Sequence, residues 1–284
     1  MRFAKRLRLI DKSKRQQGFT LVELVIVIVL LGIMATGVTS FISLSTQTYV
    51  NVADRDELIA SARFAVERLN RELRNAVPNS VRVKNQSGFN CIEFVPTIAS
   101  TVYVDIPVAP EGAKTTLSVI PFQGKDGNDY QCTGSCNDVV IVYPVYDTEI
   151  YSDPTDNVGK MFGLKAVTQT SATLWTLTLD HLAGDLFDAD SPTKRMYIAK
   201  SPVTYCTFSN SLYRFDNYTI DNGVYIFPPV LPVLMAENLT VVDVPFIVQH
   251  STLQRNSQVQ VKLHFLLNDE NIVFNNDIHL ANTP

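Results

Sequence analysis

The chain has 284 residues, 46% of them hydrophobic, and its 24 basic and 28 acidic side chains give a formal net charge of −4. Residues 1–18 contain seven of the basic residues but only one acidic residue, so the other 17 basic and 27 acidic residues give the rest of the chain a net charge of −10. This negative charge argues against nucleic-acid binding, which requires a basic face. The hydrophobic content is ample for one sizeable core or two fused lobes.

The first 44 residues combine a basic leader with an apolar segment that contains one carboxylate. The apolar segment extends from Phe19 to about Leu44, which is longer than the roughly 20 residues needed to cross a bilayer. The positive leader keeps the N-terminus cytoplasmic and directs the rest of the chain outward. An ionisable group within a membrane segment costs about 2.5–3.5 kcal/mol on insertion scales, so Glu23 is a candidate functional residue. The alternative is a boundary residue whose carboxylate reaches the lipid headgroups.

Five residues at the junction between leader and apolar segment form one pattern: Gly18, Phe19, Thr20, Leu21 and Glu23. This pattern resembles the class III signal of type IV pilins and type II secretion pseudopilins. The resemblance implies cleavage after Gly18 by prepilin peptidase, N-methylation of Phe19, and pairing of Glu23 with the new terminal amine, usually that of a neighbouring subunit. The alternative is an ordinary secretory signal with small residues at positions 35 and 37. Glu23 and the unbroken helical pattern argue against that alternative.

Residues 45–77 have the periodicity of an amphipathic helix. Apolar side chains recur on one face at intervals of three, four and seven residues, at Val52, Ile59, Ala62, Val66, Leu69, Leu73 and Val77. No proline precedes Pro78, so we expect a single helix from Phe19 to about Ala76, roughly 85–90 Å long. Residues 19–44 would lie in the membrane, and residues 45–77 would cover a globular domain formed by residues 78–284. A coiled-coil stalk and a membrane anchor followed by a separate helix are the alternatives.

Beyond Pro78 the apolar period changes from 3.6 to 2, which indicates strands. The expected strands are Cys91–Val95, Val102–Val108, Val139–Val145, Leu174–Leu179, Met196–Ala199, Val203–Phe208, Leu239–Val244, Val259–Leu267 and Ile272–Leu280. Residues 268–271 predict a hairpin connection, and residues 148–160 predict a loop-rich insertion. The predicted fold class is α+β, with a long N-terminal helix packed on an antiparallel, β-rich domain, as in pilin-like proteins.

Four cysteines lie in the part of the chain that would be exported: Cys91, Cys132, Cys136 and Cys206. An even number of cysteines in an oxidising compartment favours disulfides, and four cysteines allow three connectivities. Cys132 and Cys136 can close a small local loop, which leaves Cys91 to pair with Cys206. We prefer this connectivity. Metal binding is the weaker alternative, because one Cys-x3-Cys has no nearby histidine.

Outside the N-terminus the sequence offers little catalytic chemistry. The four histidines lack partners at metal-ligand spacing, and none lies in a recognisable nucleophile motif. Asp185, Asp188 and Asp190 supply clustered oxygen ligands of the kind that calcium prefers, and some pseudopilins bind calcium. Their spacing is not that of an EF-hand loop, so we prefer a solvated acidic turn. We therefore expect a non-enzymatic protein without a cofactor or a bound metal.

Three further segments resemble particular subgroups of pilin-like proteins. Residues 62–74 are similar to the helix of the large minor pilins of the PilW and GspJ types, and residues 211–215 and 278–284 are similar to minor pilins of the mannose-sensitive haemagglutinin (MSHA) pilus. The resemblance implies a structural subunit at the tip of a type IV pilus that primes filament assembly. The alternatives are a minor pseudopilin of type II secretion and a tip adhesin that binds a surface or glycan directly.

The resemblance also implies partners and a location. The implied partners are prepilin peptidase, the major pilin, other minor pilins and the inner-membrane assembly platform. The subunit would first span the inner membrane once, with a cytoplasmic N-terminus and a periplasmic domain. It would then enter the pilus filament at the cell surface.

The first prediction concerns processing. The mature protein should begin at Phe19, because only Gly18 has a basic leader before it and the Phe-Thr-Leu-x-Glu pattern after it. Replacing Gly18 with a bulky residue should leave the full-length precursor in the membrane. Mass spectrometry of membrane or filament fractions measures this, and wild-type protein that retains residues 1–18 would contradict the prediction.

Overall fold

The computed structural model describes residues 18–280 except residues 87, 133, 135, 152–157, 182, 221–226, 241–243, 252–254 and 269. The chain divides into two compact units, Met1–Ala53 and Asp54–Pro284. A single α-helix, α1 (Leu21–Arg74), begins in the first unit and ends in the second. The predicted single helix is therefore present, two residues shorter at each end than expected.

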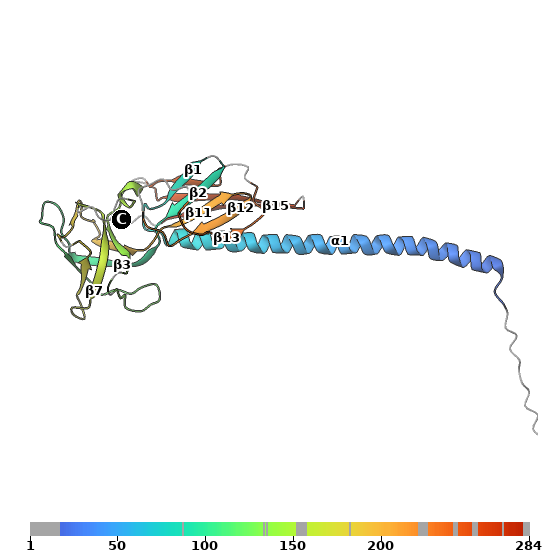
Figure 1. Ribbon diagram of the computed structural model, residues 1–284, viewed down its shortest axis with the longest axis horizontal. Coiled ribbons are helices and arrows are strands. Elements are labelled where there is room, and N and C mark those ends of the chain that lie inside the picture. Colours follow the sequence, from blue (N-terminus) through green and yellow to red (C-terminus); the bar gives the residue numbers. More distant parts are fainter. Residues whose placement is uncertain are drawn as a thin grey trace, which may run out of the picture. The chain divides into compact units, whose positions relative to one another are not determined.

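The second unit consists mainly of antiparallel β-sheet, which gives the chain the predicted α+β fold (Figure 1). A five-stranded sheet has the order β1 (Arg82–Gln86), β2 (Phe89–Phe94), β11 (Val203–Phe208), β12 (Ser211–Phe215) and β13 (Val233–Ala236). A three-stranded sheet has the order β14 (Phe246–Gln249), β15 (Gln258–Leu267) and β16 (Glu270–His279). A closed barrel has the order β10 (Arg195–Ala199), β3 (Thr97–Asp105), β4 (Thr116–Val119), β8 (Trp175–Leu179), β7 (Met161–Thr168) and β5 (Asp138–Val142). The 3-10 helix η1 (Asp147–Glu149) and the parallel pair β6 (Val158–Gly159) and β9 (Leu186–Phe187) complete the described elements.

The barrel is inserted between two neighbouring strands of the five-stranded sheet. Strands β2 and β11 pair directly with each other, yet the whole barrel lies between them in the sequence. The chain leaves the sheet after β2, enters the barrel at β3, and returns from β10 to β11. The five-stranded sheet would otherwise be a plain meander, in which each strand pairs with the next.

One face of α1 packs against the five-stranded and three-stranded sheets, and α1 from Asp54 onward together with these two sheets is the helix-bearing lobe. Figure 1 shows β2, β11, β12 and β13 beside the part of α1 that belongs to the second unit. The buried face has the helical spacing of three and four residues, and its members are Leu58, Ala62, Ala65, Val66, Leu69 and Leu73. These side chains pack against Phe94 and Tyr205 of the five-stranded sheet and against Val261 and Phe265 of β15. Val52, which we expected on this face, is exposed and belongs to the first unit.

A charged side chain on α1 also binds the sheet. Glu72 accepts hydrogen bonds from the Tyr205 hydroxyl and from Arg214 Nε, both at 3.0 Å, and from Arg68 Nε at 3.1 Å. Burial raises the pKa of Tyr205, and the charge of Glu72 raises it further. Burial of Arg214 opposes its charge, but its hydrogen bonds to Asp216 and Glu72 outweigh that effect and raise the pKa. The helix is thus fixed to β11 and β12 by direction-specific bonds as well as by apolar packing.

A separate core joins the barrel to the helix-bearing lobe. It contains Val77 and Val95 from the side of the helix-bearing lobe and Ile141, Tyr151 and Tyr197 from the barrel side. The Tyr151 hydroxyl donates a hydrogen bond of 2.9 Å to the Ser80 carbonyl oxygen. The Arg82 guanidinium lies 3.4 Å from the centre of the Tyr151 ring and also pairs with the buried Glu93. These contacts place a desolvated cation on an aromatic face at the junction.

Several strand predictions needed correction. The predicted strand Val102–Val108 starts and ends too late in the sequence, because β3 extends from Thr97 to Asp105. In the described part of Leu239–Val244 there is an isolated bridge from Leu239 to Phe265 but no strand, and the next strand begins only at Phe246. Residues 241–243 lie outside the described residues, as do residues 152–157 of the expected insertion. We did not predict β7, because Gly163 interrupts the run of strand-forming residues in its sequence. The absence of a side chain at Gly163 leaves space for the Asp180 side chain.

The second prediction tests the packing of α1. Leu69→Ala removes a fully buried side chain from the helix-bearing core, so it should lower the free energy of unfolding by about 2–5 kcal/mol. Phe64→Ala is the matched control on the exposed face of the same helix and should change stability by about 0.5 kcal/mol or less. Urea unfolding of the portion from residue 54 onward measures both effects, and equal effects would contradict the assigned face.

Candidate functional site at the N-terminus

The predicted processing site lies at the start of α1. Residues 1–17 of the leader lie outside the described residues, and Gly18 is the first residue described. Gly18, Phe19 and Thr20 are not helical, and α1 begins at Leu21. Phe19 is 82% exposed, so the peptide bond after Gly18 lies in an accessible, non-helical segment immediately before the helix.

Thr20 and Glu23 form a reciprocal cap on the helix. The Thr20 hydroxyl oxygen accepts a hydrogen bond of 3.3 Å from the Glu23 backbone N–H. In return, Glu23 Oε2 accepts bonds from the Thr20 backbone N–H at 3.2 Å and from the Thr20 hydroxyl at 3.3 Å. This arrangement is a capping box, which satisfies backbone donors that have no partner inside the helix. The Glu23 charge also lies at the positive end of the helix dipole.

This cap adds a second role to the one expected for Glu23. The sequence interpretation gave Glu23 a partner on a neighbouring chain, whereas in this structure its carboxylate binds Thr20 of its own chain. Cleavage after Gly18 would place a new amino group on Phe19, only one residue before Thr20. The capped carboxylate is therefore held close to the place where a positive charge would arise. The spacing Thr-x-x-Glu signals such a cap and was available from the sequence.

The helix that follows carries an apolar surface with no covering in the described chain. Its apolar side chains from Leu21 to Leu44 are 44–79% exposed. The helix contains a segment that is long and apolar enough to cross a membrane, and none of this segment is buried. Such a surface requires lipid or other apolar helices around it. The helix therefore supports the interpretation that the protein is anchored in the membrane by a single span.

The cysteines form two disulfides in the structure. Cys91 on β2 is bonded to Cys206 on β11, and Cys132 is bonded to Cys136 in the connection before β5. These are the two pairs preferred from the sequence. Cys91 and Cys206 are also register partners in the β2–β11 ladder, so their disulfide crosslinks the two strands that flank the inserted barrel. A crosslink between residues 115 positions apart restricts the unfolded chain strongly.

The smaller disulfide lies beside a buried hydrogen bond. The Tyr130 hydroxyl donates a bond of 2.5 Å to Asp138 Oδ2, across the loop that contains the disulfide. Burial raises the pKa of Asp138 even though the Tyr130 bond and the charge of Lys200 oppose the shift. The loop between Tyr130 and Asp138 is therefore closed both by the disulfide and by a buried hydrogen bond.

The three aspartates considered for calcium have different surroundings. Asp185 is buried and bonded to His181, and burial raises the Asp185 pKa despite that bond. Asp190 accepts a hydrogen bond from the Tyr103 hydroxyl, and Asp188 is exposed. Across the described ranges, no three His, Cys, Asp or Glu side chains are grouped so that they could hold a metal ion. The structure therefore does not bring the three aspartates together as one set of ligands.

Comparison with known proteins identifies the N-terminal segment. A family model described as the prokaryotic N-terminal methylation motif matches residues 13–39. The match includes Gly18, Phe19 and Glu23 and continues into α1. No curated protein and no solved structure matches the chain significantly.

The matched motif, the single long helix and the β-rich domain together support a type IV pilin or pseudopilin. The motif implies processing by prepilin peptidase and assembly with other pilins by the inner-membrane machinery. It favours a structural role and not an enzymatic one.

The third prediction separates the two roles of Glu23. Glu23→Ala should permit cleavage but impair assembly, because it removes both the cap and the charge. Glu23→Gln keeps an oxygen that can accept the Thr20 bonds but carries no charge. If the charge is required for assembly, both variants should be cleaved and both should be nearly absent from sheared filaments. Quantitative immunoblots of membrane and filament fractions measure this, and wild-type incorporation of Glu23→Gln would show that the cap alone is sufficient.

Proposed function

We propose that this chain is a minor pilin of an MSHA-like type IV pilus, of the MshO type, placed at the filament tip where it primes assembly. The N-terminal motif supports a filament subunit, and the resemblance of residues 62–74 and 211–215 supports the minor-pilin group. Residues 211–215 form β12 of the five-stranded sheet. Residues 281–284, the end of the third resembling segment, lie outside the described residues.

The inserted barrel is the observation that supports a tip position. Among the described residues, it adds six strands to a lobe that already contains the C-terminal part of α1 and eight strands in two sheets. Helices in a packed shaft lie about 10 Å apart. A domain of this size on every helix would crowd such a shaft, whereas at the tip one end of the domain is unconstrained. A subunit needed in only one or a few copies at the tip can carry the barrel without crowding the shaft.

The proposed assembly pathway follows from the N-terminal geometry. The precursor would rest in the inner membrane with its leader in the cytoplasm, and prepilin peptidase would cleave after Gly18 and methylate Phe19. Leaving the bilayer costs little if the apolar part of α1 repacks against similar helices. Glu23 then gains an opposite charge in a low-dielectric environment, which compensates the desolvation of its carboxylate.

The nearest alternative is a minor pseudopilin of type II secretion, which would use the same N-terminal chemistry. The genes adjacent to this one distinguish the two systems: pilus genes support the proposal, and secretion genes support the alternative. A tip adhesin is a further alternative, and a glycan-binding screen with the domain from residue 54 onward tests it.

The fourth prediction tests the tip role. The protein should be scarce relative to a small major pilin, and deletion of its gene should reduce the number of filaments but not their length, because priming affects initiation only. Electron microscopy of filaments with immunogold labelling measures number, length and position. Labelling distributed evenly along the filaments, at a stoichiometry near that of the major pilin, would contradict the tip assignment.

A further inference from the structure

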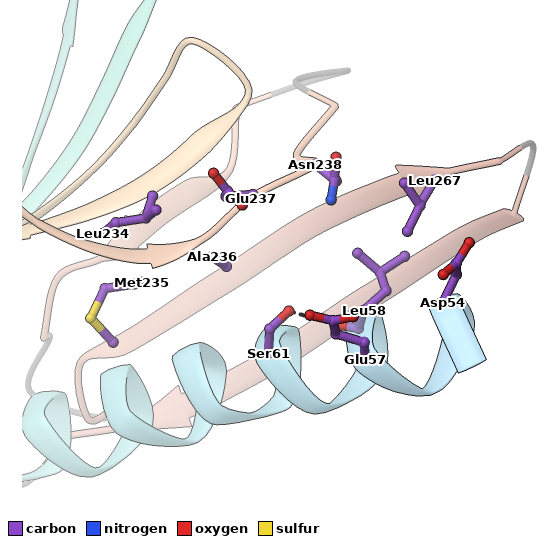
Figure 2. A pocket seen from close by; sticks show the side chains of 10 residues that line it. All are labelled: Asp54, Glu57, Leu58, Ser61, Leu234, Met235, Ala236, Glu237, Asn238 and Leu267. Atoms are coloured by element: carbon purple, nitrogen blue, oxygen red, sulfur yellow. Dashed lines mark hydrogen bonds between the residues drawn. The ribbon is translucent and has the colours of Figure 1, made fainter. Parts of the chain in front are cut away.

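A groove lies between the start of the second unit's part of α1 and the edge of the five-stranded sheet (Figure 2). Its volume is about 350 Å³. The residues that line it are Asp54, Glu57, Leu58, Ser61, Leu234, Met235, Ala236, Glu237, Asn238 and Leu267. Figure 2 shows that the first four come from α1, whereas Leu234 to Asn238 come from β13 and the segment that follows it.

The β13 wall of the groove is apolar and partly uncovered. β13 is the last strand of the five-stranded sheet, and among the described strands it pairs only with β12. On β13, Met235 and Ala236 are buried and Leu234 is 48% exposed, whereas Leu58 is buried on the α1 wall. Two apolar residues that precede Leu234 in the chain are also exposed, Val233 at 50% and Leu231 at 94%. Exposed apolar side chains beside a groove mark a surface that another chain can cover.

The groove is also acidic, which restricts what can cover it. Asp54, Glu57 and Glu237 line it, and no lysine, arginine or histidine is among its lining residues. Asp54 accepts a hydrogen bond of 2.8 Å from the Asn268 side chain. Within the described part of the chain, Glu57 and Glu237 have neither an ion pair nor a hydrogen bond through their side chains. Figure 2 places them on opposite walls, Glu57 on α1 and Glu237 after β13.

We propose that this groove receives a helix of a neighbouring, different pilin-like subunit. That helix places an arginine or lysine between Glu57 and Glu237 and an apolar side chain on Leu234. The proposal rests on the proposed function, since it takes the partner to be another filament subunit. Charge complementarity supports a basic occupant, and the exposed apolar wall supports an apolar neighbour beside the basic residue.

The exposed face of α1 shows that a helix of this kind can present such a pattern. Arg63, Phe64 and Arg71 are all exposed on it, and Phe64 is 57% exposed. A second copy of this chain would bind through two different surfaces, groove to helix, and such a contact propagates into a ring or an open chain of identical subunits. A subunit used in one or a few copies at a tip forms neither assembly, so the occupant is a different subunit with a comparable helix face.

Site-specific photo-crosslinking in filament-forming cells tests the proposal on the full-length protein. A photoreactive amino acid replaces Leu234, and the matched control carries it at Val273 on β16, which is 49% exposed and does not line the groove. The Leu234 position should yield an adduct with a different protein that has a class III signal, crosslinked within that protein's helix. The Val273 position should not yield this adduct.

Charge reversal supplies the second arm. The double variant Glu57→Lys and Glu237→Lys should reduce the Leu234 adduct about tenfold or more, because its two positive charges repel the arginine or lysine of the partner helix. Glu67→Lys, on the exposed face of the same helix and outside the groove, should leave the adduct unchanged. Thiol titration of each variant verifies that both disulfides are intact, so that loss of the adduct is not a consequence of unfolding.

Three results would overturn the proposal: no adduct at Leu234 in cells that make filaments, an adduct with a second copy of this chain, or an adduct that survives the double charge reversal. The proposed function fails on different observations, namely a retained leader or unchanged filament number after deletion. If processing and priming are intact and the Leu234 adduct is absent, only the groove assignment is wrong.

Discussion

The second unit depends on the packing of one face of α1 against two sheets that would not otherwise share a core. Leu69 and Leu73 are fully buried between the five-stranded sheet and β15. A helix of 54 residues with only its C-terminal part covered obtains its tertiary stabilisation from this contact. Glu72 fixes the rotation of the helix, because its carboxylate binds Tyr205 and Arg214 on neighbouring strands. The same helix therefore serves as the scaffold of the domain and as the membrane segment.

The inserted barrel imposes a second constraint. Its two connections leave and re-enter the sheet on the adjacent strands β2 and β11, which must stay paired for the sheet to remain whole. The disulfide between Cys91 and Cys206 crosslinks these strands, and the core around Tyr151 fixes the barrel to the lobe beside them. A large module can therefore be added between two strands without changing the surface that α1 covers.

The sequence predicted the local features well, because their signals are local. The Gly18 to Glu23 pattern, the single helix and the strands that alternate regularly, such as β15 and β16, follow from spacing within a few residues. The barrel was not predicted, because its closure depends on the pairing of β5 with β10, which are far apart in the sequence. Leu58 was missed as a buried residue because Ile59, beside it, fits the same helical face almost as well. The groove could not be predicted either, because it unites Glu57 with Glu237 only after folding.

The central claim is that this chain leaves the membrane and becomes a filament subunit after processing at Gly18. Quantitative mass spectrometry of sheared filaments, purified free of membrane, tests it most directly. The account predicts an N-terminal peptide that begins with N-methylated Phe19 in the filament fraction, at a small fraction of the major pilin. A chain that begins at Phe19 in the membrane but is absent from the filaments would contradict the account.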